Sequence, residues 1–100
     1  MPNTSRRAGS AKGPRPITYL VEHYWPGITA ETFRSAAERV RTTAEAMSRD
    51  GTPIRYRHST MVPADEAGFC VVDAASAELI EQLYARAGVR FERIVAAVEV

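Results

Sequence analysis

Four side chains in this sequence have the chemistry of transition-metal ligands: Glu22, His23, His58 and Cys70. Imidazole, thiolate and carboxylate groups together suit nickel, zinc or copper, whereas magnesium and calcium prefer oxygen ligands alone. His58 is the leading candidate because it lies in a half-polar strand pattern, where a neutral imidazole can face an ion. Cys70 is the weakest, since the apolar run around it suits a buried thiol. The sequence predicts no catalytic residue and no organic cofactor.

Hydrophobic spacing predicts the elements that must position these side chains. Alternation predicts strands over residues 17–24, 54–62, 69–73 and 93–100. Apolar steps of three and four predict helices over residues 30–49 and 77–87. Thr29 and Ser76 are expected to cap these helices, while Gly51 and Gly88 are expected to end them. Residues 63–68 are predicted to form a polar turn between the second and third strands.

The predicted order of elements is strand, helix, strand, strand, helix, strand. This is the split βαβ, or ferredoxin-like, order of an α+β domain with both helices on one face of an antiparallel sheet. Right-handed crossovers then give the strand order 4-1-3-2, with residues 17–24 and 69–73 in the centre. Both faces of the first strand carry apolar residues, so the face without helices is expected to pair with a second copy. The predicted assembly is a homodimeric α+β barrel.

Charge and composition limit the classes of protein that fit. Residues 1–16 hold four basic side chains and no acid, and they predict a disordered basic tail before a domain over residues 17–100. The remaining chain has 9 basic and 12 acidic residues, a balance that disfavours nucleic-acid binding. There is no apolar run long enough for a membrane span, and a single cysteine suits a reducing compartment. A cytoplasmic location is expected.

The two histidines share the same alternation in their predicted strands. His23 has the parity of Tyr19 and Val21, and His58 has the parity of Ile54 and Tyr56. These two strands flank the third strand, at about 4.8 Å per strand, so we expect one ion to be held either between the two histidines or across a dimer. The sequence leaves both arrangements open.

Several short segments resemble a small bacterial nickel-binding family of ferredoxin-like fold. They are Tyr19-Leu20-Val21-Glu22, Pro26-Gly27, His58-Ser59, Phe69-Cys70 and Arg86-Ala87-Gly88. The resemblance spans residues 17–100 and implies a homodimer that binds nickel or another divalent transition metal and has no established catalytic activity. This sequence has His23 where many members carry arginine, and Leu83 where many carry a histidine in the second helix.

Three functions remain open at this point. The first is non-enzymatic binding of a nickel-type metal by a small homodimer. The alternative is a cofactor-less α+β barrel enzyme, in which a cavity histidine acts as a base on an aromatic or polyketide-like substrate. The third is an interaction module that works through its basic tail. Metal content of untagged protein separates the first two, and deletion of residues 1–15 tests the third.

Overall fold

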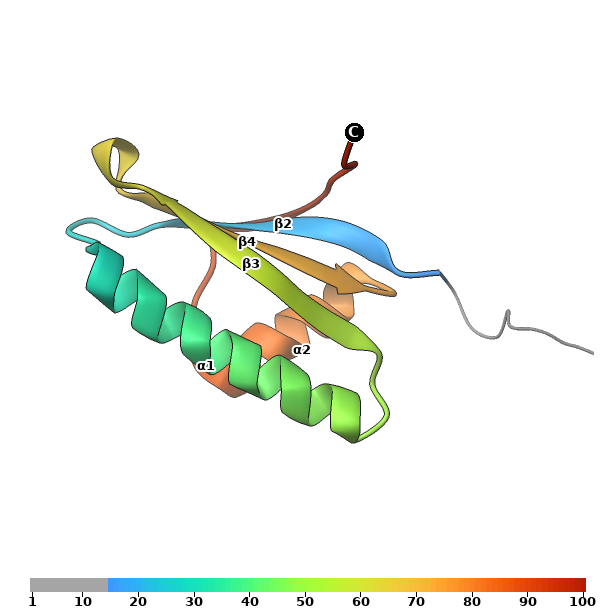
Figure 1. Cartoon of the computed structure of the whole chain (residues 1–100). Coiled ribbons are helices and arrows are strands. Elements are labelled where there is room, and N and C mark those ends of the chain that lie inside the picture. Colours follow the sequence, from blue (N-terminus) through green and yellow to red (C-terminus); the bar gives the residue numbers. More distant parts are fainter. Residues whose placement is uncertain (1–14) are drawn as a thin grey trace, which may run out of the picture.

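The computed structural model describes residues 15–100, which form a four-stranded sheet and two helices. Figure 1 shows their arrangement. In chain order the elements are β2 (Ile17–Tyr24), α1 (Ala30–Arg49), β3 (Ile54–Val62), the short 3-10 turn η1 (Pro63–Asp65), β4 (Ala67–Ala74), α2 (Ala77–Ala87) and β5 (Arg93–Ala96). The tail predicted over residues 1–16 lies outside the described residues except for Arg15 and Pro16, which are both exposed. Neither helix within residues 15–100 combines the length and the apolar character of a membrane span.

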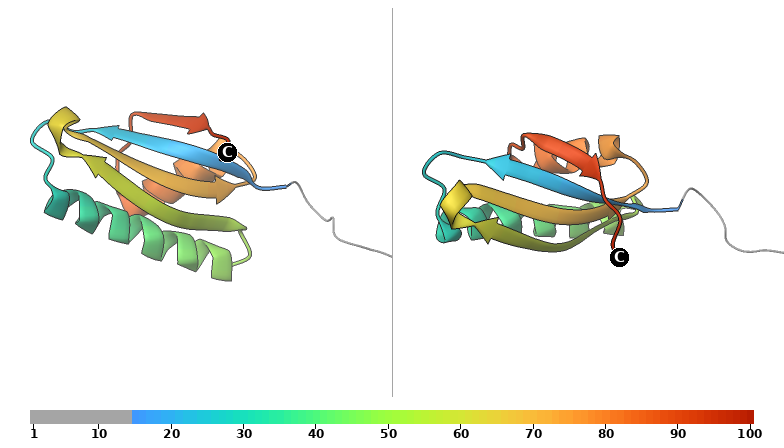
Figure 2. Two further views of the ribbon diagram at one scale, coloured as in Figure 1. Left: turned by 45° about the horizontal axis from the view of Figure 1, so that its top comes forward. Right: turned by 90° about the horizontal axis from the view of Figure 1, so that it is seen from above.

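The sheet has the predicted strand order. β4 and β2 lie in the centre, β3 and β5 lie at the edges, and every neighbouring pair is antiparallel. Both helices lie on one face of this sheet, and neither helix covers the other face, which we call the open face (Figure 2). The predicted ferredoxin-like α+β fold with order 4-1-3-2 is therefore confirmed.

The helix ends follow the predicted capping residues. Thr29 accepts a hydrogen bond from Thr32 N at 3.1 Å, and the Thr32 hydroxyl accepts one from Thr29 N at 3.0 Å, which completes a capping box. Ser76 caps α2 by accepting a hydrogen bond from Leu79 N at 3.4 Å. Gly88 ends α2 with φ at +72°, a left-handed conformation that glycine adopts without steric strain.

The core lies between the sheet and the two helices. α1 buries the predicted stripe, and its buried residues are Phe33, Ala36, Ala37, Val40, Ala44 and Met47. α2 contributes Ile80, Leu83 and Tyr84, all exposed by 1% or less. From β2, Tyr19, Val21 and His23 face these helices and are buried, because alternate side chains of a strand share one face. His23, one of the four predicted metal ligands, is thus a core residue.

Two strands differ in length from the prediction. β4 begins at Ala67 and runs to Ala74, longer than the predicted 69–73. β5 ends at Ala96, so the predicted strand over 93–100 is wrong beyond that residue. Ala96 lies opposite Tyr19, and Ala97 N still donates a hydrogen bond to Thr18 O at 2.8 Å. Because β2 begins at Ile17, one residue before Thr18, the residues after Ala97 have no strand to pair with. The last residues instead cross toward β3 (Figure 2), where the Glu99 carboxylate lies 2.6 Å from Arg57 Nη1.

Candidate functional site

A bulge in β3 sets the position of His58. Tyr56 lies opposite Val72 and His58 lies opposite Val71, so Arg57 is an extra residue without a partner on β4. The extra residue reverses the alternation, and His58 therefore lies on the open face, where it is exposed. His23 faces the helices instead. The two histidines of one chain therefore lie on opposite faces of the sheet, and of the two arrangements left open by the sequence, one ion held between them within a chain does not fit.

His23 is fully enclosed in the core. Its ring lies 5.0 Å from the Trp25 ring, 5.6 Å from the Phe33 ring and 5.5 Å from the Tyr84 ring, measured between centroids. Nδ1 lies 3.0 Å from the backbone oxygen of Arg90. A carbonyl oxygen only accepts, so Nδ1 carries the proton and Nε2 carries a lone pair. Burial lowers the pKa of His23, and the hydrogen bond to Arg90 opposes this shift only in part.

A chain of buried and half-buried hydrogen-bonding groups begins at His23. Cys70 Sγ lies 3.7 Å from His23 Nε2, and Ser59 Oγ donates to Cys70 Sγ at 3.0 Å. Because the Ser59 proton goes to sulfur, the Tyr56 hydroxyl must donate to Ser59 Oγ. The Cys70 S–H can then donate to Nε2. Each hydrogen bond from the Tyr56 hydroxyl to the Arg90 carbonyl thus has a defined donor and a defined acceptor.

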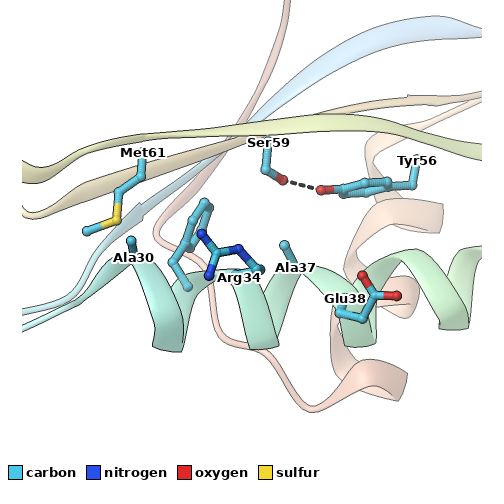
Figure 3. Close-up of a pocket in the computed structure, with 8 residues that line it drawn as sticks. Ala30, Arg34, Ala37, Glu38, Tyr56, Ser59 and Met61 are labelled. Atoms are coloured by element: carbon cyan, nitrogen blue, oxygen red, sulfur yellow. Dashed lines mark hydrogen bonds between the residues drawn. The ribbon is translucent and has the colours of Figure 1, made fainter.

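The chain ends at a cavity of about 310 Å³ between α1 and β3 (Figure 3). Its lining residues are Ala30, Phe33, Arg34, Ala37, Glu38, Tyr56, Ser59 and Met61. The Tyr56 and Ser59 hydroxyls lie on the β3 side, facing the charged side chains of Arg34 and Glu38 on α1 (Figure 3). Sequence alternation did not predict this cavity, because Ser59 and Met61 face the helices only as a result of the bulge.

We expect the Cys70 thiol to be unreactive in the folded protein. The residue is 1% exposed, and burial raises the pKa of its thiol, so little of the nucleophilic thiolate is present. Modification by a soluble disulfide reagent at pH 8 should be at least about a hundredfold slower than in the unfolded chain. Cys70 is the only cysteine, so absorbance of the released thiolate measures the rate directly. Equal rates with and without denaturant would contradict this prediction.

Glu22 lies on the open face but is tightly held. Its side chain is 7% exposed, and Arg93 Nη2 donates to Oε2 at 2.9 Å. The Tyr24 hydroxyl donates to Oε1 at 2.9 Å. These two hydrogen bonds, that from Arg93 first, lower the pKa of Glu22, so its carboxylate is ionised at neutral pH. A metal would have to displace one of these partners to use Glu22.

The four predicted ligands do not meet in one chain. His23 and Cys70 lie together on the helix side of the sheet, while His58 and Glu22 lie on the open face. His58 pairs with Val71, whereas Glu22 pairs with Phe69, so two strand spacings and two residues separate them, about 12 Å. Within residues 15–100 no three His, Cys, Asp or Glu side chains are grouped closely enough to hold an ion. Leu83, where the resemblance led us to expect a histidine, is fully buried. The described residues of one chain therefore do not form a closed metal site.

Comparison with known proteins identifies the family. The family model described as nickel responsive protein SCO4226-like matches residues 19–96. The crystal structure of SCO4226 from Streptomyces coelicolor A3(2) superimposes with a TM-score of 0.66 at 20% sequence identity, covering 83% of this chain and 98% of that one. That identity supports a shared fold only. No curated protein matches the sequence. The family match covers most of the chain, which therefore belongs to the nickel responsive SCO4226-like family.

Proposed function

We propose that this protein is a non-enzymatic, cytoplasmic homodimer that binds nickel or a similar divalent transition metal through His58. One observation carries the proposal: the bulge at Arg57 places the only exposed histidine of the described residues on the open face of the sheet. Imidazole is a common ligand of nickel, zinc and copper. Family membership favours nickel among these metals.

A homodimer covers the open face of the sheet and brings a second copy of each metal ligand on that face. The open face carries half-buried apolar side chains that no helix covers: Leu20, Phe69, Val71 and Val95. Pairing through this face buries them, which matters for a domain that buries only about 60–65% of its unfolded surface. A two-fold axis also presents every ligand of the face twice. His58 from both copies then contributes to one interface.

Nickel titration of untagged protein tests the role of His58. Loss of a ligand imidazole should weaken binding at least about tenfold, equivalent to about 1.4 kcal/mol, in the variant His58→Ala. Thr60→Ala is the matched control, because Thr60 is exposed on the same face two residues along β3. Calorimetry should give parent-like binding for the control. Equal affinities of parent and His58→Ala would assign the metal to other ligands, and absence of binding by the parent would end the metal proposal.

Sedimentation of the same samples tests the dimer separately. The parent should sediment as a species of twice the 11.0 kDa chain at micromolar concentration. Replacing the open-face residue Val71 with aspartate should shift it to the monomer, since an unpaired charge in an apolar interface is strongly unfavourable. A parent that remains at 11.0 kDa would contradict the dimer.

The enzyme alternative gains no support from the comparisons, and His23, enclosed in the core, is not in a position to act as a cavity base.

A further inference from the structure

A second hollow lies on the opposite side of α1 from the cavity at Ser59. Its volume is about 410 Å³, and its lining residues are Trp25, Thr32, Ser35, Ala36, Arg39, Gly88, Val89 and Arg90. These residues come from the position directly after β2, from the first half of α1 and from the segment after α2. Three separate parts of the chain thus bring two arginines and the indole of Trp25 to one place.

The polar side chains that line this hollow include no acid. Arg39 uses only its Nε, which donates to Ala87 O at the long distance of 3.4 Å. Arg90 forms one loose ion pair, with Glu92, whose Oε2 lies 4.0 Å from its Nε, beyond hydrogen-bond range. The only contact between Arg39 and the C-terminal end of α2 among these hydrogen bonds is thus the weak one to the Ala87 carbonyl. Among the described residues, the terminal amino groups of both guanidinium groups have no acceptor.

Trp25 adds an independent observation. Its Nε1 is covered by protein atoms and has no hydrogen-bond partner within residues 15–100. Indole N–H is only a donor, and buried donors are normally paired. The Arg90 guanidinium lies 6.0 Å from the centre of the same ring, in cation–π range. The hollow thus combines the positive charge of two arginines with an aromatic wall formed by Trp25.

We propose that this hollow binds a small oxyanion of the phosphate or carboxylate class, held between Arg39 and Arg90. The planar guanidinium group presents paired N–H donors that match the oxygens of such an anion. The Ser35 hydroxyl, on the α1 turn before Arg39, supplies a neutral donor beside them. This site is distinct from the proposed metal site, because its residues lie on the helix side of the molecule and His58 lies on the open face.

Fluorescence of Trp25 tests the proposal, since Trp25 is the only tryptophan of the chain. The full-length protein is titrated with sodium phosphate at pH 7 in the presence of EDTA, with sodium acetate and sodium chloride at matched ionic strength as the other arms. Phosphate should give a saturable change with millimolar or tighter affinity, and chloride should not. A response to acetate as strong as that to phosphate would assign the site to carboxylates within the same class.

Variants locate the site. Arg39→Gln and Arg90→Gln should each weaken phosphate binding at least fivefold, and both side chains are exposed, so the fold should persist by circular dichroism. Arg34→Gln is the matched control, because Arg34 is an exposed arginine of α1 that lines the other cavity. It should bind as the parent does. Equal binding by all variants would overturn the location, and identical responses to phosphate, acetate and chloride would overturn the site itself. EDTA keeps either result independent of metal binding.

Discussion

Replacement of Gly68 by alanine is expected to lower the free energy of unfolding by about 2–3 kcal/mol, in the upper part of the range of about 1–3 kcal/mol that overpacking of a dense core costs. A Cβ at this buried position would lie 2.6 Å from Cζ and 2.8 Å from Cδ1 of Phe33, well inside contact distance. Gly68 does not have the positive φ that favours glycine, so the loss would come from this clash rather than from a left-handed backbone. Guanidinium unfolding followed by circular dichroism measures it.

Phe33 has little room to move away. It is 5% exposed, and its ring packs against the rings of His23 at 5.6 Å and Trp25 at 6.1 Å. The variant Phe33→Leu provides the control, because a smaller side chain should relieve the clash. Gly68→Ala should therefore be milder in the Phe33→Leu background than in the parent, giving a coupling of about 1 kcal/mol or more. A loss below about 0.5 kcal/mol in the parent background would show that the core opens freely at this point.

The helices and the strand order were predictable because each rests on a local pattern. The spacing of Phe33, Val40 and Met47 fixes the buried side of α1, and Thr29, Ser76 and Gly88 mark helix ends through their own hydrogen-bonding or conformational properties. The handedness of crossovers then selects one sheet order. None of these steps requires knowledge of which residues pair across the sheet.

The faces of β3 were not predictable for the opposite reason. Residues 54–62 alternate regularly in the sequence, and either Thr60 or Met61 can be placed toward the core by a shift of one residue. The bulge at Arg57 exists only in the pairing with β4, so it leaves no local pattern. It turns Ser59 and Met61 inward and His58 outward. Both the cavity at Ser59 and the position of the leading metal candidate depend on it.

The partners of the buried polar side chains come from distant parts of the chain. His23 contacts the backbone of Arg90, and Glu22 is held by Arg93, both from the segment after α2. The sequence interpretation of Cys70 as a small buried residue agrees with its 1% exposure. Full burial of His23 was not predicted, because both faces of β2 are apolar and alternation alone does not say which one the helices cover.

Acidification from pH 7.5 to 5.5 is expected to destabilise the protein through His23, by up to about 1.4 kcal/mol. Burial holds the pKa of His23 below its ordinary value of 6.5, despite the opposing effects of the Arg90 carbonyl and the Glu92 charge. As the pH falls through about 6.5, His23 therefore becomes protonated in the unfolded chain while it stays neutral in the folded chain. The contribution of His23 to the free energy of unfolding is complete above about pH 6.5. It decreases as the pH falls, and it becomes constant below the lowered pKa of the folded state.

The two histidines make this prediction separable, because the chain contains no others. Chemical unfolding at a series of pH values should show the same loss in His58→Ala as in the parent, since this variant retains the buried His23. His23→Leu should be less stable at every pH, because Arg90 O and Cys70 lose their partner, but its stability should stay nearly flat over this range. The carboxylate of Glu22 does not interfere, since its pKa is lowered in the folded protein and its contribution to stability is therefore lost only at more acidic pH. If His58→Ala abolishes the pH dependence and His23→Leu retains it, the buried imidazole is not the group that titrates.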